Sequence, residues 1–257
     1  MKLLPLALSI VATVLSPPCF AGKALDAIRT LGVLRVGTTG DYKPFTFRAP
    51  DGTYSGADIA MAQKLAQELR VKVEFVPTTW GALLPDFMAH KYDIAMGGVS
   101  ILPDRAAQGD FSTPVNIDGK RPIVRCADKE RYTTVAAIDK PDIRVVEPPG
   151  ASNEAFARAN LAHAQLSIFP DNTTIFNEII AGRADVMVTD GIEVDHQAYL
   201  HPELCAASVA APFSKVSKAY LLPKDDPDFL KLVDDWIAKE KSSGDLQRVL
   251  EAALHQK

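Results

Sequence analysis

Asn172-Thr-Thr-Ile-Phe-Asn-Glu-Ile-Ile-Ala-Gly-Arg-Ala-Asp-Val-Met-Val-Thr-Asp-Gly-Ile-Glu193 contains a helix pattern, a strand pattern and two carboxylates in one short stretch. Apolar residues at helical spacing end at Gly182, which predicts a short helix. The run 185–189 then predicts a buried strand. Asp190-Gly191 breaks that strand, so Asp190 and Glu193 are expected at its carboxyl end, where open α/β sheets bind their ligands.

The same pattern occurs 92 positions earlier in the chain. Asp93-Ile-Ala-Met precedes Asp185-Val-Met-Val at that spacing, and the apolar helix positions repeat too: Leu83, Leu84, Phe87 and Met88 precede Ile175, Phe176, Ile179 and Ile180. The strands that open the two halves are also similar, Val33-Leu-Arg-Val-Gly-Thr-Thr-Gly40 and Ile143-Arg-Val-Val-Glu-Pro-Pro-Gly150. We therefore predict an α/β fold of two lobes whose strand ends face each other across a cleft.

The passage between the lobes is expected within residues 111–122, where turn residues are frequent. Apolar residues at helical spacing predict one long helix over 227–251, which returns to the first lobe so that the chain crosses twice. The predicted domains are residues 22–118 with 213–257 for the first lobe and 119–212 for the second. The helix of the second lobe that runs to Leu161 is expected to take Ser152 or Asn153 as its N-cap.

The composition fits a globular protein with a small-molecule ligand. The chain has 257 residues, 47% of them hydrophobic, so it can bury a substantial core. A formal net charge of −4 and the absence of a long like-charge run exclude a nucleic-acid partner. The five histidines are scattered without metal-ligand spacing, so neither a metal nor a cofactor is expected.

Residues 1–21 are predicted to be a signal peptide. Lys2 is followed by an apolar run over 3–15 that is too short to span a bilayer, and Cys19-Phe20-Ala21 matches a small-residue cleavage pattern. The mature protein is therefore expected to be exported, with cleavage near Ala21 and no stable membrane association afterwards. A buried N-terminal helix is the alternative.

Cleavage would leave two cysteines, Cys126 and Cys205. An even pair in an oxidising compartment predicts one disulfide, with two free buried thiols as the alternative.

Two loops carry groups that suit a carboxylate ligand. Gly97-Gly98 allows close backbone approach, Ser100 offers a hydroxyl, and Arg105 offers a planar fork of donors. By itself this pattern also fits a surface turn with a solvated arginine. Ser152 and Asn153 fit a simple helix start, but backbone donors there also favour an anion.

The chain resembles the periplasmic amino-acid-binding proteins of transport systems over nearly all of its mature length. The resemblance rests on these residues: Leu34-Arg-Val-Gly-Thr38, Tyr42-x-Pro-Phe45, Gly56-x-Asp58, Asp93-Ile-Ala-Met96, Ser100 with Arg105, Phe111-Ser112 and Val188-Thr-Asp190. It implies a periplasmic location and two lobes that close about a hinge over a small ligand. In those relatives the position of Asp190 pairs with the ligand's ammonium group.

An enzymatic branch of that family, the cyclohexadienyl dehydratases, is more similar still. The matching runs are Thr38-Thr-Gly-Asp-Tyr-Lys-Pro-Phe45, Thr79-Trp80, Asp118-Gly-Lys120, Asn153-Glu154, Phe156-Ala-Arg-Ala-Asn-Leu161, Pro170-Asp-Asn172 and His201-Pro-Glu-Leu-Cys205. By this resemblance Glu193 is the catalytic acid, Arg105, Ser100 and Ser152 hold a substrate carboxylate, and Trp80 shapes the pocket. The further expected substrate contacts are Asn153, Asp190, Lys120, Tyr42 and Thr38. The implied substrates are prephenate and arogenate.

That chemistry requires a proton donor at the position of Glu193. Prephenate loses water and carbon dioxide together, and hydroxide is a poor leaving group unless it is protonated as its bond breaks. Burial and the nearby charge of Asp190 are both expected to raise the pKa of Glu193 and keep it protonated near neutral pH. The alternative is a solvated acid in the first turn of a helix, where negative charge is favourable.

Two functions therefore remain open at this point. The first is an exported lyase that acts on prephenate and arogenate, and the second is a non-catalytic receptor that delivers an amino acid to a membrane transporter. Both would use the same fold with Arg105 and Asp190. Glu193 and the surroundings of Trp80 favour the enzyme.

Overall fold

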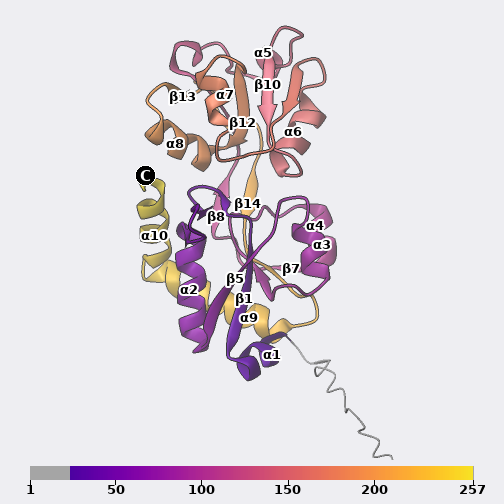
Figure 1. Cartoon of the computed structure of the whole chain (residues 1–257), viewed down its shortest axis with the longest axis vertical. Coiled ribbons are helices and arrows are strands. Elements are labelled where there is room, and N and C mark those ends of the chain that lie inside the picture. Colours follow the sequence, from indigo (N-terminus) through magenta and orange to yellow (C-terminus); the bar gives the residue numbers. More distant parts are fainter. Residues whose placement is uncertain (1–23, 257) are drawn as a thin grey trace, which may run out of the picture.

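A computed structural model describes residues 24–256 of the chain. The predicted signal peptide and its cleavage site lie outside the described residues. The chain forms two α/β lobes, one above the other, with two strands passing between them (Figure 1). The predicted two-lobed α/β fold is thereby confirmed.

The first lobe is built on a five-stranded sheet in the order β5 (Lys72–Pro77), β1 (Val33–Thr38), β6 (Ile94–Ala95), β15 (Leu221–Leu222) and β7 (Asp110–Phe111). β1 pairs in parallel with β5 and β6, whereas β15 is antiparallel to its neighbours. Its helices are α1 (Ala24–Leu31), α2 (Ala57–Leu69), α3 (Leu83–Met88), α4 (Pro103–Gln108), α9 (Pro227–Ser242) and α10 (Asp245–Leu254). A small sheet of β2 (Asp41–Tyr42), β3 (Thr46–Arg48) and β4 (Tyr54–Ser55) lies beside α2.

The second lobe repeats the plan. Its sheet runs β11 (Gln165–Ile168), β10 (Arg144–Glu147), β12 (Val186–Asp190), β9 (Lys120–Arg125) and β13 (Leu204–Ala206). The helices are η1 (Cys126–Asp128), α5 (Val135–Ile138), α6 (Ser152–Asn160), α7 (Phe176–Ile180) and α8 (Gly191–Leu200). Two apolar clusters pack against this sheet, one including Val145 and Val188 and the other Val146 and Met187. Neighbouring residues along a strand point to opposite faces of the sheet. The strand β12 is apolar at successive positions because both faces of the sheet are buried there.

The lobes are joined by an antiparallel ribbon of β8 (Asn116–Asp118) and β14 (Val216–Lys218), which passes between them in Figure 1. Lys218 pairs with Asn116 and Val216 with Asp118. A two-stranded ribbon that connects two lobes is a natural place for a hinge. It also places Lys218 at the junction of the lobes.

The expected disulfide is present, linking Cys126 and Cys205 within the second lobe. Two sequence predictions about helices were wrong. The long C-terminal helix is two helices, because Gly244 takes a left-handed conformation with φ of 75° between α9 and α10. The N-cap of α6 is Ala151, and the side chains of Ser152 and Asn153 turn toward Lys120 instead of capping the helix.

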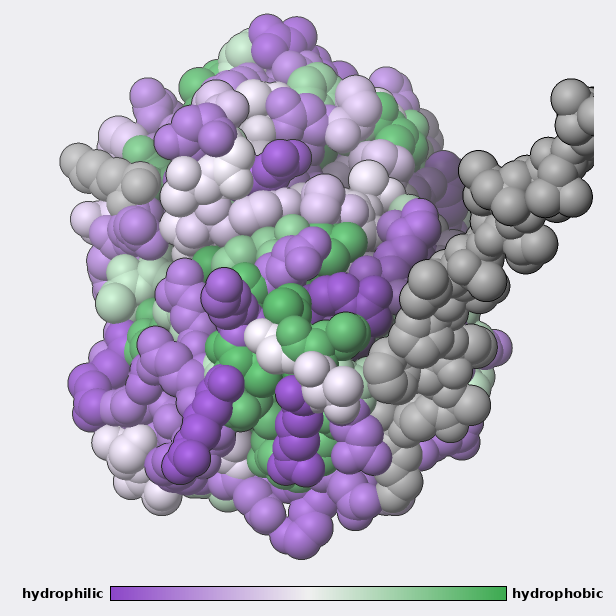
Figure 2. All heavy atoms as spheres, turned by 60° about the horizontal axis from the view of Figure 1, so that its bottom comes forward, coloured by the Kyte–Doolittle hydropathy of each residue, from purple (hydrophilic) through white to green (hydrophobic). Residues whose placement is uncertain are grey.

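The surface is largely polar. Figure 2, which brings the lower end of Figure 1 forward, shows hydrophilic residues spread around a group of hydrophobic ones. The exposed large apolar residues of the described chain are scattered over both lobes and the hinge: Leu31, Met88, Ile117, Ile168 and Tyr199. None of the helices in this part of the chain has the length and apolar character needed to cross a bilayer.

Candidate active site

A pocket lies between the lobes. Its walls come from segments that follow strand ends in both lobes and from the hinge strand β14. The lining residues are Tyr42, Trp80, Gly98, Ser100, Arg105, Pro148, Ala151, Ser152, Asn153, Asn172, Asp190 and Lys218. Seven of the ten predicted site residues therefore meet at one pocket, while Glu193, Lys120 and Thr38 lie outside its lining.

Arg105 forms part of the wall contributed by the first lobe. It lies on the short helix α4 and is 5% exposed, with burial lowering the pKa of its guanidinium. Nη1 donates to the Ser100 carbonyl at 3.2 Å, and the guanidinium lies 5.8 Å from the centre of the Trp80 ring. One backbone acceptor leaves the remaining donors of the fork able to bind a carboxylate.

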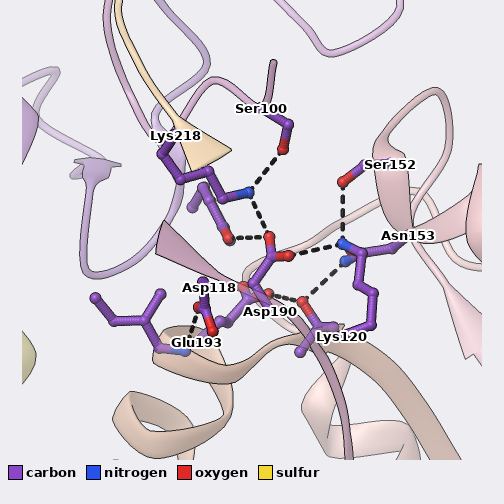
Figure 3. A network of polar contacts seen from close by, with 12 residues as sticks. Ser100, Asp118, Lys120, Ser152, Asn153, Asp190, Glu193 and Lys218 are labelled. Atoms are coloured by element: carbon purple, nitrogen blue, oxygen red, sulfur yellow. Dashed lines mark hydrogen bonds and ion pairs between the residues drawn. The ribbon is translucent and has the colours of Figure 1, made fainter. Parts of the chain in front are cut away.

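Asp190 is the centre of a buried charge cluster (Figure 3). Its Oδ2 lies 2.5 Å from Lys218 Nζ and accepts a 2.5 Å hydrogen bond from the Tyr42 hydroxyl, while Oδ1 lies 3.0 Å from Lys120 Nζ. Burial alone raises the pKa of Asp190, but the two lysine charges outweigh burial and hold that pKa below its ordinary range. Asp190 is therefore an ionised carboxylate shared between two cations.

The two lysines also hold the polar groups of the pocket wall. Lys218 donates to the Ser100 hydroxyl at 2.8 Å, and Lys120 donates to the Ser152 hydroxyl at 3.0 Å and to the side-chain oxygen of Asn153. The fully buried Lys218 comes from the hinge, and Lys120 is the first residue of β9 beyond it. The cluster thus couples both lobes to the hinge through ion pairs and hydrogen bonds.

Glu193 lies behind this wall, in the first turn of α8, and is 1% exposed. The amide of Asn153 donates to the Thr189 hydroxyl at 3.0 Å, and that hydroxyl donates to Glu193 Oε2. Burial is the largest cause of a pKa raised to about 8, with the charge of Asp190 adding to it and the Thr189 hydrogen bond opposing it. Glu193 therefore keeps its proton at neutral pH, whereas Asp190, three residues earlier in the chain, is ionised.

Thr38 does not reach the pocket. Its Oγ1 donates to the Thr46 hydroxyl at 2.8 Å. The same Oγ1 lies 2.8 Å from the position that a Cβ atom on Gly97 would occupy. The Gly97 and Gly98 amides are in turn held by Asp58 Oδ2 at 3.0 and 2.6 Å. Thr38 packs under the glycine turn, so it lies behind the wall of the pocket.

Sequence reasoning missed Lys218 and Glu147. No local pattern marks Lys218, and only its hinge position opposite Asn116 could have indicated that it faces the cleft. Glu147 is fully buried at the end of β10, where Oε1 accepts from the Val188 amide at 2.8 Å. Burial raises the pKa of Glu147 well above its ordinary value. The pattern Val-Val-Glu-Pro-Pro gave no sign that this carboxyl is buried.

In the part of the chain that the structure describes, no group of three or more His, Cys, Asp or Glu side chains is placed so that it could hold a metal ion. The cations around the pocket are the side chains of Arg105, Lys120 and Lys218. These three groups can stabilise negative charge on a ligand.

Known proteins share this architecture. The family model of bacterial extracellular solute-binding proteins, family 3, matches residues 34–255. A cyclohexadienyl dehydratase from Pseudomonas aeruginosa is 48% identical over 227 residues, which cover 88% of this chain and 84% of that protein. The L-cystine-binding protein TcyJ of Escherichia coli strain K12 is 29% identical over the same shares of the two chains.

Solved structures give the same result. An ancestral amino-acid-binding protein described as a precursor of cyclohexadienyl dehydratase superposes with a TM-score of 0.82 at 36% identity, covering 90% of this chain and 99% of that one. An ancestral cyclohexadienyl dehydratase is 46% identical with a TM-score of 0.58, covering 92% and 98%. The resemblance inferred from the sequence motifs is confirmed, and the chain belongs to the bacterial extracellular solute-binding proteins of family 3.

Proposed function

We propose that this protein is an exported cyclohexadienyl dehydratase, a lyase that converts prephenate to phenylpyruvate and arogenate to phenylalanine. The observation that carries the proposal is Glu193, a buried carboxyl whose pKa is raised to about 8 directly behind a pocket lined by cations. A receptor that only binds amino acids has no need of a protonated acid there. The similarity to the Pseudomonas aeruginosa dehydratase supports the same activity.

In this proposal Glu193 is the general acid. The ring hydroxyl of the substrate replaces the Thr189 hydroxyl as its partner, since catalytic hydrogen bonds often form only in the substrate complex. The proton of Glu193 passes to the leaving oxygen as the carbon–oxygen bond breaks, which releases water. The electron pair of the ring–carboxylate bond completes the aromatic ring, and carbon dioxide leaves. Glu193 then recovers a proton from solvent when the cleft opens.

The charges of the site suit a dianion. Prephenate carries two carboxylates, and the pocket is lined by Arg105 and Lys218, with Lys120 behind its wall sharing the single charge of Asp190 with Lys218. We assign one substrate carboxylate to Arg105 and Ser100 and the other to Lys120, Ser152 and Asn153. Trp80 lies edge-on to Tyr42 at 5.7 Å and shapes the face for the ring.

The same cluster argues against the receptor. In that alternative Asp190 binds the ammonium group of an amino acid, yet here Lys218 and Lys120 already neutralise it. A ligand ammonium would have to share Asp190 with two buried lysines, and because this also applies to the ammonium group of arogenate, the cluster fits prephenate better than arogenate.

The proposal includes location and motion. The protein acts in the periplasm after cleavage near Ala21, without stable membrane association. Residues 22–118 with 213–257 form one moving lobe and 119–212 the other, and the ribbon of β8 and β14 is the hinge.

One assay tests the function. Purified mature protein is incubated with prephenate while phenylpyruvate is followed by absorbance, and a parallel reaction with arogenate is analysed for phenylalanine. We expect release far above the spontaneous rate. Release at the spontaneous rate, together with tight binding of an amino acid in calorimetry, would establish the receptor instead.

A further inference from the structure

A second pocket, of about 120 Å³, lies at another part of the interface between the lobes. It is formed by the segment 43–56 of the first lobe, by His196 of α8, and by Ala253 and Gln256 at the end of the chain. None of its lining residues lines the pocket around Asp190. It is therefore a separate space, on the helix that carries Glu193.

This pocket lies where the C-terminal helix meets the second lobe. In Figure 1, α10 ends directly below α8. His196 Nδ1 lies 2.7 Å from the Leu254 carbonyl, and the rings of Tyr199 and His255 meet edge to face at 5.2 Å. Because the ribbon of β8 and β14 allows the lobes to separate, these contacts belong to the closed arrangement.

His196 has one side of its ring unsatisfied. A carbonyl only accepts, so Nδ1 carries the proton, and Nε2 is shielded from solvent with no hydrogen-bond partner among residues 24–256. The ring is 1% exposed, and burial lowers its pKa, with the bases Lys43, His201 and His255 adding to that effect. A buried polar atom without a partner costs about 1–3 kcal/mol, which a suitable ligand group would recover.

Lys43 is a cation without a counter-charge. Within the described chain it makes no ion pair or side-chain hydrogen bond, and its Nζ lies 4.4 Å from the centre of the Phe47 ring. Burial lowers the pKa of Lys43, as expected for an ammonium group partly removed from water. A lysine and a histidine therefore line one pocket without an acid among its lining residues.

We propose that this pocket binds a small organic carboxylate and that the bound anion holds the two lobes together. Its negative group lies between Lys43 of the first lobe and His196 of the second, which takes up a proton at Nε2 as the anion binds so that this Nε2–H donates to it. Pro44, Phe47 and Ala253 give the pocket apolar surface for a carbon body, and Gln256 offers an amide at its edge. Because the two charged partners belong to different lobes, occupancy favours closure and slows exchange of ligand in the main cleft.

Benzoate is the probe, and the ring resonances of His196 are the readout. The apparent pKa of His196 is measured by NMR in the full mature protein, with and without benzoate. Pairing with a carboxylate is expected to raise that pKa by about one unit. Benzamide, which has the same shape without the charge, should leave it unchanged.

Variants separate this pocket from the main one. Lys43→Met should abolish the benzoate effect, Lys43→Gln should do the same if the methionine variant folds poorly, and the exposed Lys140→Met should retain it. Loss of the effect in the Lys43 variants alone supports the proposal. If the pKa of His196 responds equally in Lys43→Met, or equally to benzamide, or does not respond to benzoate, the proposal is wrong. These outcomes do not depend on whether prephenate is the substrate.

Discussion

The two lobes share a scaffold but differ where their central strands end. In each lobe the opening strand is locked to the strand after the repeated helix by an arginine–aspartate clamp. Arg35 Nη2 lies 2.5 Å from Asp93 Oδ1 in the first lobe, and Arg144 Nη2 lies 2.7 Å from Asp185 Oδ1 in the second. In both, the aspartate also accepts from the backbone amide of its arginine.

Beyond that clamp the lobes diverge. The strand β6 leads into Gly97-Gly98, whose amides bind the buried Asp58. The strand β12 leads into Asp190 and the first turn of α8, where Glu193 holds its proton. The comparison teaches that the duplicated scaffold positions two strand ends, and that the proposed acid Glu193 and the buried Asp190 belong to only one of them.

The largest expected effect separates these strand ends. Glu193→Gln keeps shape and hydrogen bonding but removes the proton, so the turnover of prephenate should fall about 100-fold or more. Because Glu193 donates only below its pKa of about 8, wild-type turnover should decline above that pH, and the residual rate of the variant should not. Steady-state kinetics across pH measure both. Wild-type turnover in Glu193→Gln would reassign the acid, with Asp190 the next residue to test.

The disulfide is a second difference, because only the second lobe has one. Replacing Cys126 and Cys205 by serine opens a loop with a sequence separation of 79 and should lower the free energy of unfolding by about 2–5 kcal/mol. Chemical denaturation of the oxidised protein and the double variant measures it, with reduced wild type as the control. Equal stability of all three would mean that the bond adds nothing to this lobe.

Arg105 tests the strand end of the first lobe. Lysine keeps the charge but cannot form two parallel hydrogen bonds, so Arg105→Lys should raise the KM for prephenate about 30-fold, or about 2 kcal/mol. The folded state should persist, which circular dichroism checks. An unchanged KM would show that Arg105 does not hold a substrate carboxylate.

The sequence predicted the scaffold better than the site. The repeat of Asp93 and Asp185 at a fixed spacing identified two lobes, since strand and helix periodicity are local properties of the chain. The partners of Asp190 were harder to find, because Lys218 reaches it only when the chain returns through the hinge. Neither local pattern nor spacing encodes such a contact.

The smallest expected effect concerns the two clamps themselves. Asp185 also lies 3.2 Å from Arg125 Nη2, whereas Arg35 is the only cation paired with Asp93 in the described chain.

Burial by itself would raise the pKa of Asp185. The hydrogen bonds from Arg144 and Arg125 have a larger, opposite effect, so that the pKa falls to about 2. A folded pKa below the unfolded value means that the stabilisation is complete above about pH 4 and is lost as pH falls toward 2. After allowance for solvent screening, Asp185→Asn should cost about 1 kcal/mol more than Asp93→Asn at pH 7. The difference should shrink in acid, as measured by denaturation at both pH values. Equal losses at pH 7 would mean that Arg125 contributes nothing and that the two clamps are energetically equivalent.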